Sequence, residues 1–163
     1  MNPLPLADLV EWTAIVADEV RQGRHDVHAD PDERWHVRLF QDDRVDVWLI
    51  SWTTEQGTQM HDHGDSAGAF TVVSGELTEA VWDPTVGHVV ERTVATGDAV
   101  AFGTSYVHDV RNVGLQTAVS VHAYSPPLTT MSFYDVVGGE LEPLAKVWTD
   151  DPEVAVPDLK AVS

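Results

Sequence analysis

The chain has 163 residues, 43% of them apolar and 22% charged, which suits one domain with a real core and is too short for two. Its 27 acidic and 9 basic side chains give a net charge of −18, which repels nucleic-acid backbones and anionic membrane surfaces and makes both poor candidate partners. The absence of cysteine excludes disulfides, thiolate metal sites and a cysteine nucleophile, and without a signal-peptide pattern the expected location is the cytoplasm.

The N-terminal segment carries the pattern of an amphipathic helix. Apolar residues recur at three- and four-residue spacings from Leu6 to Val20, with Pro5 near the first turn and the end expected near Gly23. We expect residues 1–30 to form this helix and a polar connection, packed on the domain that follows.

After this helix the apolar pattern changes to that of short strands. Turn residues separate β-rich runs that predict seven strands, at residues 45–52, 69–73, 76–82, 88–94, 98–102, 107–110 and 116–124. Strands at this spacing predict an all-β sandwich or barrel over residues 31–149. Residues 150–163 are acidic and contain proline, so we expect a loose C-terminal tail.

Three histidines are spaced as metal ligands. His61 and His63 stand at i and i+2, so on an extended strand both imidazoles face one way while Asp62 faces the other. His108 follows at a distance where a later hairpin can return a third imidazole beside them. The other histidines have polar or turn contexts and are expected at the surface: His25, His28, His36 and His88.

These segments resemble the two metal-binding motifs of the cupin superfamily. Gly103 and Ser105 depart from the motifs, which have a proline and a glycine there. The resemblance implies a jelly-roll β-barrel with an N-terminal α-helix, and three metal ligands. The matching positions are Gly57, His61, His63, Gly75, Gly97, His108 and Asn112.

One departure from the usual cupin pattern shapes the expected chemistry. Many cupins supply a glutamate ligand four or five residues after the second histidine, where this chain has Ala67 and Gly68. The metal would then be held by three neutral histidines, so a divalent ion keeps its full charge and attracts an anion such as a thiolate. Three ligands also leave coordination positions open for substrate and O2. Zinc bound by three histidines with one open position is chemically possible as well.

The strand expected at residues 116–124 has one apolar and one polar face. The polar side chains are Ser120, His122 and Tyr124. They form either the exposed side of a half-buried strand or a hydrogen-bonded line into the barrel, in which Ser120 orients His122 and His122 orients the Tyr124 hydroxyl. A serine nucleophile is disfavoured, because no carboxylate stands in the expected relation to the histidine.

Together these motifs resemble the cysteine dioxygenase type I family from about Trp35 to Asp135. The segment from His61 to Ser66, followed by Phe70 and Gly75, is similar to its metal-binding strand. The polar strand followed by Ser125-Pro126-Pro127 is similar to the family's Ser-His-Tyr line. These matches lie at His61, His63, Phe70, Gly75, Ser120, His122, Tyr124, Ser125, Pro126 and Pro127.

The resemblance implies Fe(II) on the three histidines, where a thiolate and O2 bind and both oxygen atoms pass to sulfur. It places Tyr124 near the iron, held by His122, and it implies a cis peptide bond between Ser125 and Pro126. Animal members carry a cysteine that crosslinks to the tyrosine. Gly68 stands in that region here, which implies the uncrosslinked bacterial type.

The expected substrate rests on Arg38. By the same resemblance, cysteine-specific members carry an arginine at this place and a relative that prefers 3-mercaptopropionate carries a glutamine. An arginine can form two hydrogen bonds to a carboxylate, so we expect oxidation of L-cysteine to cysteine sulfinate. His36 and Met131 are expected to line the substrate pocket.

Three alternatives stay open from the sequence. The substrate could be another small thiol such as 3-mercaptopropionate or cysteamine. The protein could be a zinc or manganese cupin that acts as an isomerase or hydrolase, or a cupin that binds a small molecule without catalysis. A monomer is compatible with the sequence.

Overall fold

The computed structural model of the chain describes residues 2–154, within which one helix and ten strands form. The helix α1 spans Leu6–Arg21, as its apolar spacing predicts. The strands are β1 (His36–Gln41), β2 (Asp46–Trp52), β3 (Ala67–Ser74), β4 (Glu76–Asp83), β5 (His88–Ala95), β6 (Ala99–Phe102), β7 (His108–Arg111), β8 (Ala118–Ser125), β9 (Thr130–Val137) and β10 (Glu140–Trp148). Strands β2 to β8 are the seven that the turn pattern predicts, and β1, β9 and β10 are additional.

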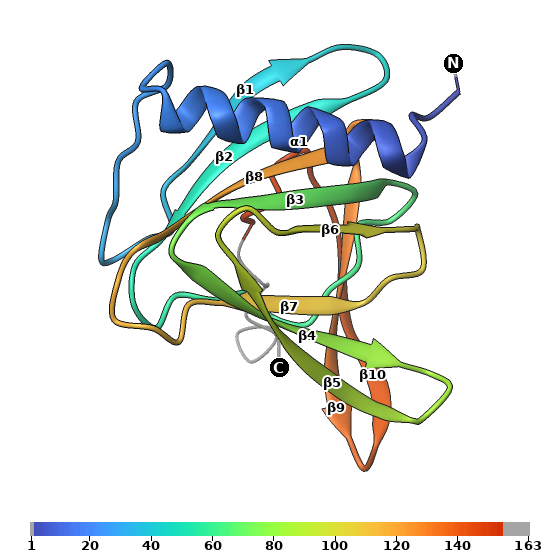
Figure 1. Ribbon diagram of the computed structural model, residues 1–163. Coiled ribbons are helices and arrows are strands. Elements are labelled where there is room, and N and C mark those ends of the chain that lie inside the picture. The colour runs from blue at the N-terminus through green and yellow to red at the C-terminus, as the bar shows by residue number, and fades with distance from the viewer. Residues whose placement is uncertain (1, 155–163) are drawn as a thin grey trace.

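The strands form two layers that face each other (Figure 1). One layer is a five-stranded sheet in the order β1-β2-β8-β3-β6. The other contains β5-β4-β7 and β10-β9, and the segment before His63 joins these two parts. Gly57 bridges to Arg111 of β7, while His61 bridges to His108 of β7 and to Phe133 of β9. This is the jelly-roll arrangement that the sequence predicts.

Helix α1 lies across the outer face of the five-stranded sheet (Figure 1). Its buried residues Leu9 and Val16 pack with Val47 of β2 and Val121 of β8 in one core cluster. The hydroxyls of Thr13 and Thr71 form a buried hydrogen bond of 2.8 Å across the same contact. The sheet is therefore covered on both faces, by the helix outside and by the barrel interior inside.

Strand β8 is buried along its whole length because it lies at the centre of this covered sheet. Val119, Val121 and Ala123 belong to the cluster under the helix. The alternate residues face the barrel interior, where the Trp52 indole donates a hydrogen bond to Ser120. The polar face of β8 is thus the inside of the barrel. The strand ends in a cis peptide bond between Ser125 and Pro126, as predicted.

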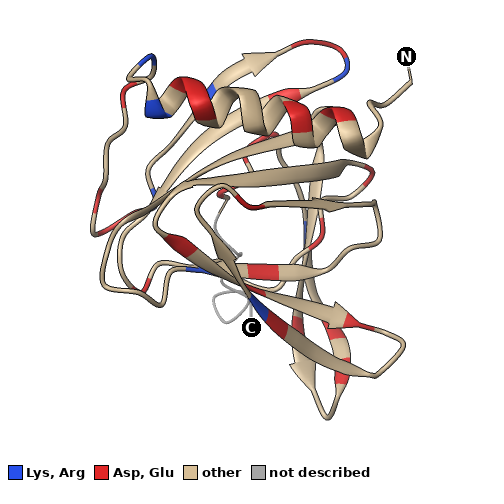
Figure 2. Cartoon of the chain, viewed as in Figure 1, with Lys and Arg blue, Asp and Glu red and all other residues tan. Residues whose placement is uncertain are grey.

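The charge distribution leaves the outer surface strongly acidic. Acidic residues are spread over α1, several loops and the strands β4, β5, β9 and β10, whereas basic residues are few (Figure 2). Within residues 2–154, no helix combines the length and the apolar character needed to cross a bilayer.

Gly64 follows His63 directly, and a substitution at this position tests how tightly this part of the fold is packed. Its φ of +59° suits glycine, and an added Cβ would overlap the Thr130 hydroxyl. Gly97 has a φ of +87° with nothing within 4 Å. We expect Gly64→Ala to lower the free energy of unfolding by more than about 1 kcal/mol, and by more than Gly97→Ala, because only Gly64 adds a steric overlap to the backbone cost. Urea denaturation of both variants measures this, and equal losses would contradict it.

Candidate metal centre

Three histidines from two segments of the chain meet inside the barrel. His61 and His63 lie on the segment that joins the two parts of the second sheet, and His108 begins β7. The backbones of His61 and His108 exchange two hydrogen bonds, of 2.9 and 3.0 Å, which hold these residues side by side. One ring nitrogen from each of the three lies within 4.8 Å of the others. The structure therefore brings together the three histidines that the sequence analysis predicts as metal ligands.

These imidazoles are buried, with exposed fractions of 4% for His61, 3% for His63 and 2% for His108. Burial lowers the pKa of His61 to about 3, and the neighbouring His108 and Arg34 further disfavour a positive charge on this ring. Burial also lowers the pKa of His63 well below its ordinary value. His61 and His63 are therefore neutral near pH 7, which is the form that binds metal ions.

The hydrogen bonds around the rings suit a metal ion. The Nδ1 of His61 donates to the Gln59 carbonyl at 2.6 Å, which leaves its Nε2 as a free electron-pair donor. The Nδ1 of His63 is buried and has no hydrogen-bond partner among residues 2–154. A histidine that only filled the core would be hydrogen-bonded, so this donor set fits a bound divalent ion.

Behind His108 stands a carboxylate that the sequence analysis missed. Glu79 of β4 has no exposed surface, and it accepts hydrogen bonds from His108 Nδ1 at 2.8 Å and from Arg92 Nε at 2.7 Å. Burial by itself raises the pKa of Glu79, but its bonds to His108 and Arg92 outweigh burial and lower the pKa below the ordinary value. The ionised carboxylate fixes the proton of His108 on Nδ1, so Nε2 faces the site.

A signal for Glu79 was present in the sequence. Leu77 and Glu79 stand at alternate positions of one strand, and both are completely buried. A charged residue on the apolar face of a strand needs a buried partner, and that partner is distant in sequence.

Aromatic rings enclose the histidines. Phe102 stacks on His63 at a centroid distance of 4.9 Å, and the Tyr124 ring lies 5.0 Å from the His63 ring. The Tyr106 ring meets His108 edge-on at 5.2 Å. These contacts hold the imidazoles in place and keep bulk water from much of their surface.

The polar line on β8 forms in part. Ser120 Oγ is hydrogen-bonded to His122 Nε2 at 2.8 Å, and it also accepts the Trp52 indole N–H at 2.9 Å. The rings of His122 and Tyr124 are 6.4 Å apart, with no hydrogen bond between them in the described part of the chain. His122 instead stacks on Phe70 at 5.0 Å, so this stacking and the Ser120 bond orient it.

Gly68 lies directly opposite Tyr124 on the neighbouring strand β3. An added Cβ at Gly68 would lie 2.5 Å from the ring of Phe102. A side chain at position 68 would therefore meet Phe102, and the chain has no cysteine that could form a crosslink.

The three expected pocket residues have different surroundings. Met131 lines a cavity of about 250 Å³ together with His61, which agrees with a place beside the metal centre. Arg38 lies over the Trp48 ring at 4.6 Å and forms ion pairs with Asp46 at 3.9 Å and Asp150 at 3.3 Å. The Nε2 atom of His36 lies 3.1 Å from the Asp151 carboxylate. Both β1 residues therefore already contact carboxylates of this chain.

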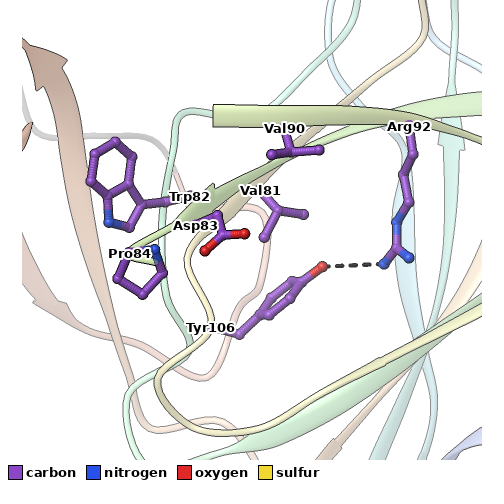
Figure 3. A pocket seen from close by; sticks show the side chains of 7 residues that line it. All are labelled: Val81, Trp82, Asp83, Pro84, Val90, Arg92 and Tyr106. Carbon is purple, nitrogen blue, oxygen red and sulfur yellow. Dashed lines mark hydrogen bonds between the residues drawn. The ribbon is translucent and has the colours of Figure 1, made fainter. Parts of the chain in front are cut away.

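A larger hollow of about 410 Å³ lies between β4, β5 and the loop before β7 (Figure 3). None of the three histidines lines it. Arg92 donates to the Tyr106 hydroxyl at 3.3 Å there, while it also holds Glu79. Of these two cavities, the smaller one touches one of the three histidines, His61, and neither of them touches His63 or His108.

The jelly-roll barrel with three buried histidines defines a cupin with a candidate metal centre. Residues 6–137 match the family model of Cysteine dioxygenase type I, so the chain belongs to this family. It is 29% identical to Cysteine dioxygenase type 1 of Rattus norvegicus over 100 residues, which are 56% of this chain and 50% of the rat protein. For the Bos taurus protein the identity is 27% over 120 residues, 67% of this chain and 60% of the bovine one. The chain thus spans about half the length of the rat relative.

Solved structures confirm the cupin fold. A protein from Thermus thermophilus, 22% identical, superposes with a TM-score of 0.54 over 61% of this chain and 90% of its own. A protein from Klebsiella pneumoniae with a double-stranded β-helix domain, 19% identical, gives 0.54 over 61% and 83%. Oxalate oxidase, 16% identical, gives 0.56 over 68% and 60%.

The role of Glu79 can be tested by removing its charge. We expect Glu79→Gln to weaken divalent metal binding about 10- to 100-fold, because His108 loses the anion that fixes its ring proton. Metal titration monitored by competition with a chelator measures the affinity. Glu76→Gln, at an exposed position on the same strand, serves as the control and keeps wild-type affinity. Equal affinity in Glu79→Gln and wild type would exclude this role.

Proposed function

We propose that this protein is a thiol dioxygenase that oxidises L-cysteine with O2 to cysteine sulfinate, using Fe(II) held by His61, His63 and His108. The carrying observation is the cluster of three buried imidazoles in a chain of the cysteine dioxygenase type I family. The curated relatives that are 27–29% identical to this chain over the aligned residues are cysteine dioxygenases, which supports this reaction. When bound, Fe(II) supplies the redox chemistry that joins O2 to a thiolate sulfur.

The charge of the donor set favours a thiolate substrate. His61 and His63 are neutral, and no carboxylate takes part in the three-residue cluster. The negative charge of Glu79 lies behind His108, where it is compensated by Arg92. An anionic sulfur is therefore attracted to the ion, whose charge no ligand has cancelled.

Tyr124 supplies a hydroxyl group in the enclosed space. Burial, and after it the negative charges of Glu153 and Asp46, raise the pKa of Tyr124 well above its ordinary value. The hydroxyl therefore keeps its proton and can donate a hydrogen bond to substrate or to a reacting oxygen atom. In this proposal Ser120 and His122 are positioning residues that keep the polar wall beside Tyr124 in one arrangement.

The rest of the proposal follows from composition and family. A small thiol and O2 are the partners, and the acidic surface disfavours nucleic acid and membranes. The cytoplasmic location and the oligomeric state stay predictions.

Oxygen consumption by the iron-loaded protein tests the reaction. We expect O2 uptake with L-cysteine and formation of the sulfinate, because both oxygen atoms pass to sulfur. His108→Ala removes a ligand and is the inactive control. A strong preference for 3-mercaptopropionate would transfer the assignment to that thiol. If the zinc-loaded protein were fully active on its substrate in the absence of O2, this result would exclude a dioxygenase and favour an isomerase or hydrolase.

Removal of a single hydroxyl tests Tyr124. We expect Tyr124→Phe to retain wild-type iron content and to lower kcat with cysteine about 10- to 100-fold, as loss of other groups that hydrogen-bond around a metal site does. Tyr134→Phe is the matched control, since the Tyr134 hydroxyl donates to the Asp62 carboxylate at 2.7 Å. An unchanged kcat in Tyr124→Phe would remove this hydroxyl from the mechanism.

A further inference from the structure

A series of hydrogen bonds leads from the surface of the protein to the candidate metal centre. Arg92 donates from Nη2 to the Tyr106 hydroxyl at 3.3 Å and from Nε to Glu79 Oε1 at 2.7 Å. The other carboxylate oxygen of Glu79 accepts a hydrogen bond from His108 Nδ1 at 2.8 Å. We call these four residues the Glu79 network. One end of this network is the ring of a predicted metal ligand.

The register of three adjacent strands places these side chains together. Arg92 of β5 and Glu79 of β4 are directly opposite each other, so both side chains lie on the same face of the sheet. On the other side of β4, His108 of β7 is paired with Val81, which stands two residues after Glu79. Glu79 and His108 are therefore diagonal neighbours on that face, within reach of a long side chain. Strand pairing thus fixes the order Arg92, Glu79, His108 across the sheet.

Burial changes steeply along the Glu79 network. Glu79 has no exposed surface and His108 is 2% exposed, whereas the side chain of Arg92 is 52% exposed. Arg92 and Tyr106 line the hollow of about 410 Å³ between β4, β5 and the loop before β7, as Figure 3 shows. The guanidinium of Arg92 is therefore the point at which solvent reaches a network whose other end is enclosed in the barrel.

Glu79 depends on Arg92 because each oxygen of its carboxylate has a different partner. Oε1 accepts from Arg92 and Oε2 accepts from His108, and no other basic residue within residues 2–154 forms an ion pair with Glu79. Ion pairs between two exposed residues contribute little free energy. Here the carboxylate is completely buried, so the loss of Arg92 would leave it with His108 as its one ionic partner. Arg92 and His108 hold this carboxylate from opposite sides.

We propose that Arg92 is a positioning residue of the metal centre, which holds Glu79 against His108 and thereby orients this ligand from the surface of the protein. The inference rests on the proposed function in one respect, that a divalent ion binds the three histidines. Arg92 touches neither the ion site nor the substrate in this proposal, and its effect passes through Glu79 alone. Groups that orient a ligand in this way contribute to metal affinity although they do not bind the ion.

Binding of Co(II) to the full chain tests Arg92 without iron, thiol or O2. We expect Arg92→Ala to weaken Co(II) binding about 10-fold in competition with a chelator, because Glu79 keeps its contact with His108 and loses the second contact that fixes it. Arg111→Ala is the matched control, since the Arg111 side chain is 49% exposed and forms an ion pair with Asp109 at 3.3 Å. We expect wild-type affinity in this control.

Two results of the Co(II) titration would overturn the inference. One is wild-type affinity in Arg92→Ala. The other is an equal loss in Arg92→Ala and Arg111→Ala, because the effect would then come from the removal of any arginine on this sheet and not from the contact with Glu79.

A double variant tests whether Arg92 acts through Glu79. We expect Glu79→Gln and Arg92→Ala/Glu79→Gln to bind Co(II) equally, because Arg92 has no carboxylate to hold once Glu79 is replaced. The double variant also lacks the buried, unpaired charge that Arg92→Ala alone leaves behind, so it separates positioning from folding. A further loss of affinity in the double variant, as large as that of Arg92→Ala in the wild-type background, would exclude this path.

The visible absorption spectrum of bound Co(II) reports the arrangement of its ligands. At saturating Co(II), we expect the bands of Arg92→Ala to shift from those of wild type in the direction of Glu79→Gln, and those of Arg111→Ala to stay in place. A residue that only stabilised the fold would leave the spectrum of the loaded site unchanged, so a wild-type spectrum in Arg92→Ala would contradict the proposal.

These results are independent of the reaction that the protein catalyses. If the iron-loaded protein oxidised no thiol while the Co(II) measurements gave the expected results, the proposed function would be refuted and the role of Arg92 would stand. If the wild-type protein oxidised cysteine while Arg92→Ala bound Co(II) like wild type, only the role of Arg92 would be refuted.

Discussion

The burial of β8 on both faces is the constraint from which the rest of the site follows. Helix α1 covers one face with an apolar contact, so the other face has only the barrel interior to occupy. Polar side chains placed there must find hydrogen-bond partners inside the protein. Ser120 and His122 pair with each other and with Trp52, and this arrangement lines the chamber in which the three histidines meet.

A carboxylate is present near the three histidines, but it does not have the position of the glutamate ligand in the usual cupin motif. No carboxylate takes part in the three-histidine cluster, yet Glu79 touches the far side of His108. A negative charge at that place orients a ligand and leaves the charge of a bound ion largely uncancelled, whereas a ligand carboxylate would cancel part of it directly. Arg92 then balances Glu79 on its outer side. Glu79 thus acts on the candidate metal centre only through the imidazole of His108.

The acidity of the chain has a local use beyond the solvated surface. Asp150 and Asp151 contact Arg38 and His36 on β1, and Glu153 forms an ion pair with Arg34 just before it, so the first residues of the segment predicted as a loose tail lie against the barrel. The rest of that segment, residues 155–163, lies outside the described part of the chain. A carboxylate at the depth of Glu153, whose side chain is 5% exposed, needs a charged partner, and Arg34 provides it.

Much of the fold and of the site could be predicted from the sequence, because these features depend on the periodicity and spacing of residues that are close together in the chain. The helix repeat, the seven strands β2 to β8 and the pair His61 and His63 are all properties of neighbouring residues. Strands β9 and β10 were missed because β10 carries Pro143 and several charged residues at largely exposed positions, so its pattern resembles a loop until β9 pairs with it.

What only the tertiary structure decided are the contacts between residues far apart in the chain. The sequence by itself determined that Ser120, His122 and Tyr124 share one face, but the helix packed over the opposite face decided that they point inward. Glu79 meets His108 across 29 residues, and Glu153 meets Arg34 across 119. Alternation along a strand specifies which side chains lie together on a face, while the partner of a buried charge depends on how the sheets close.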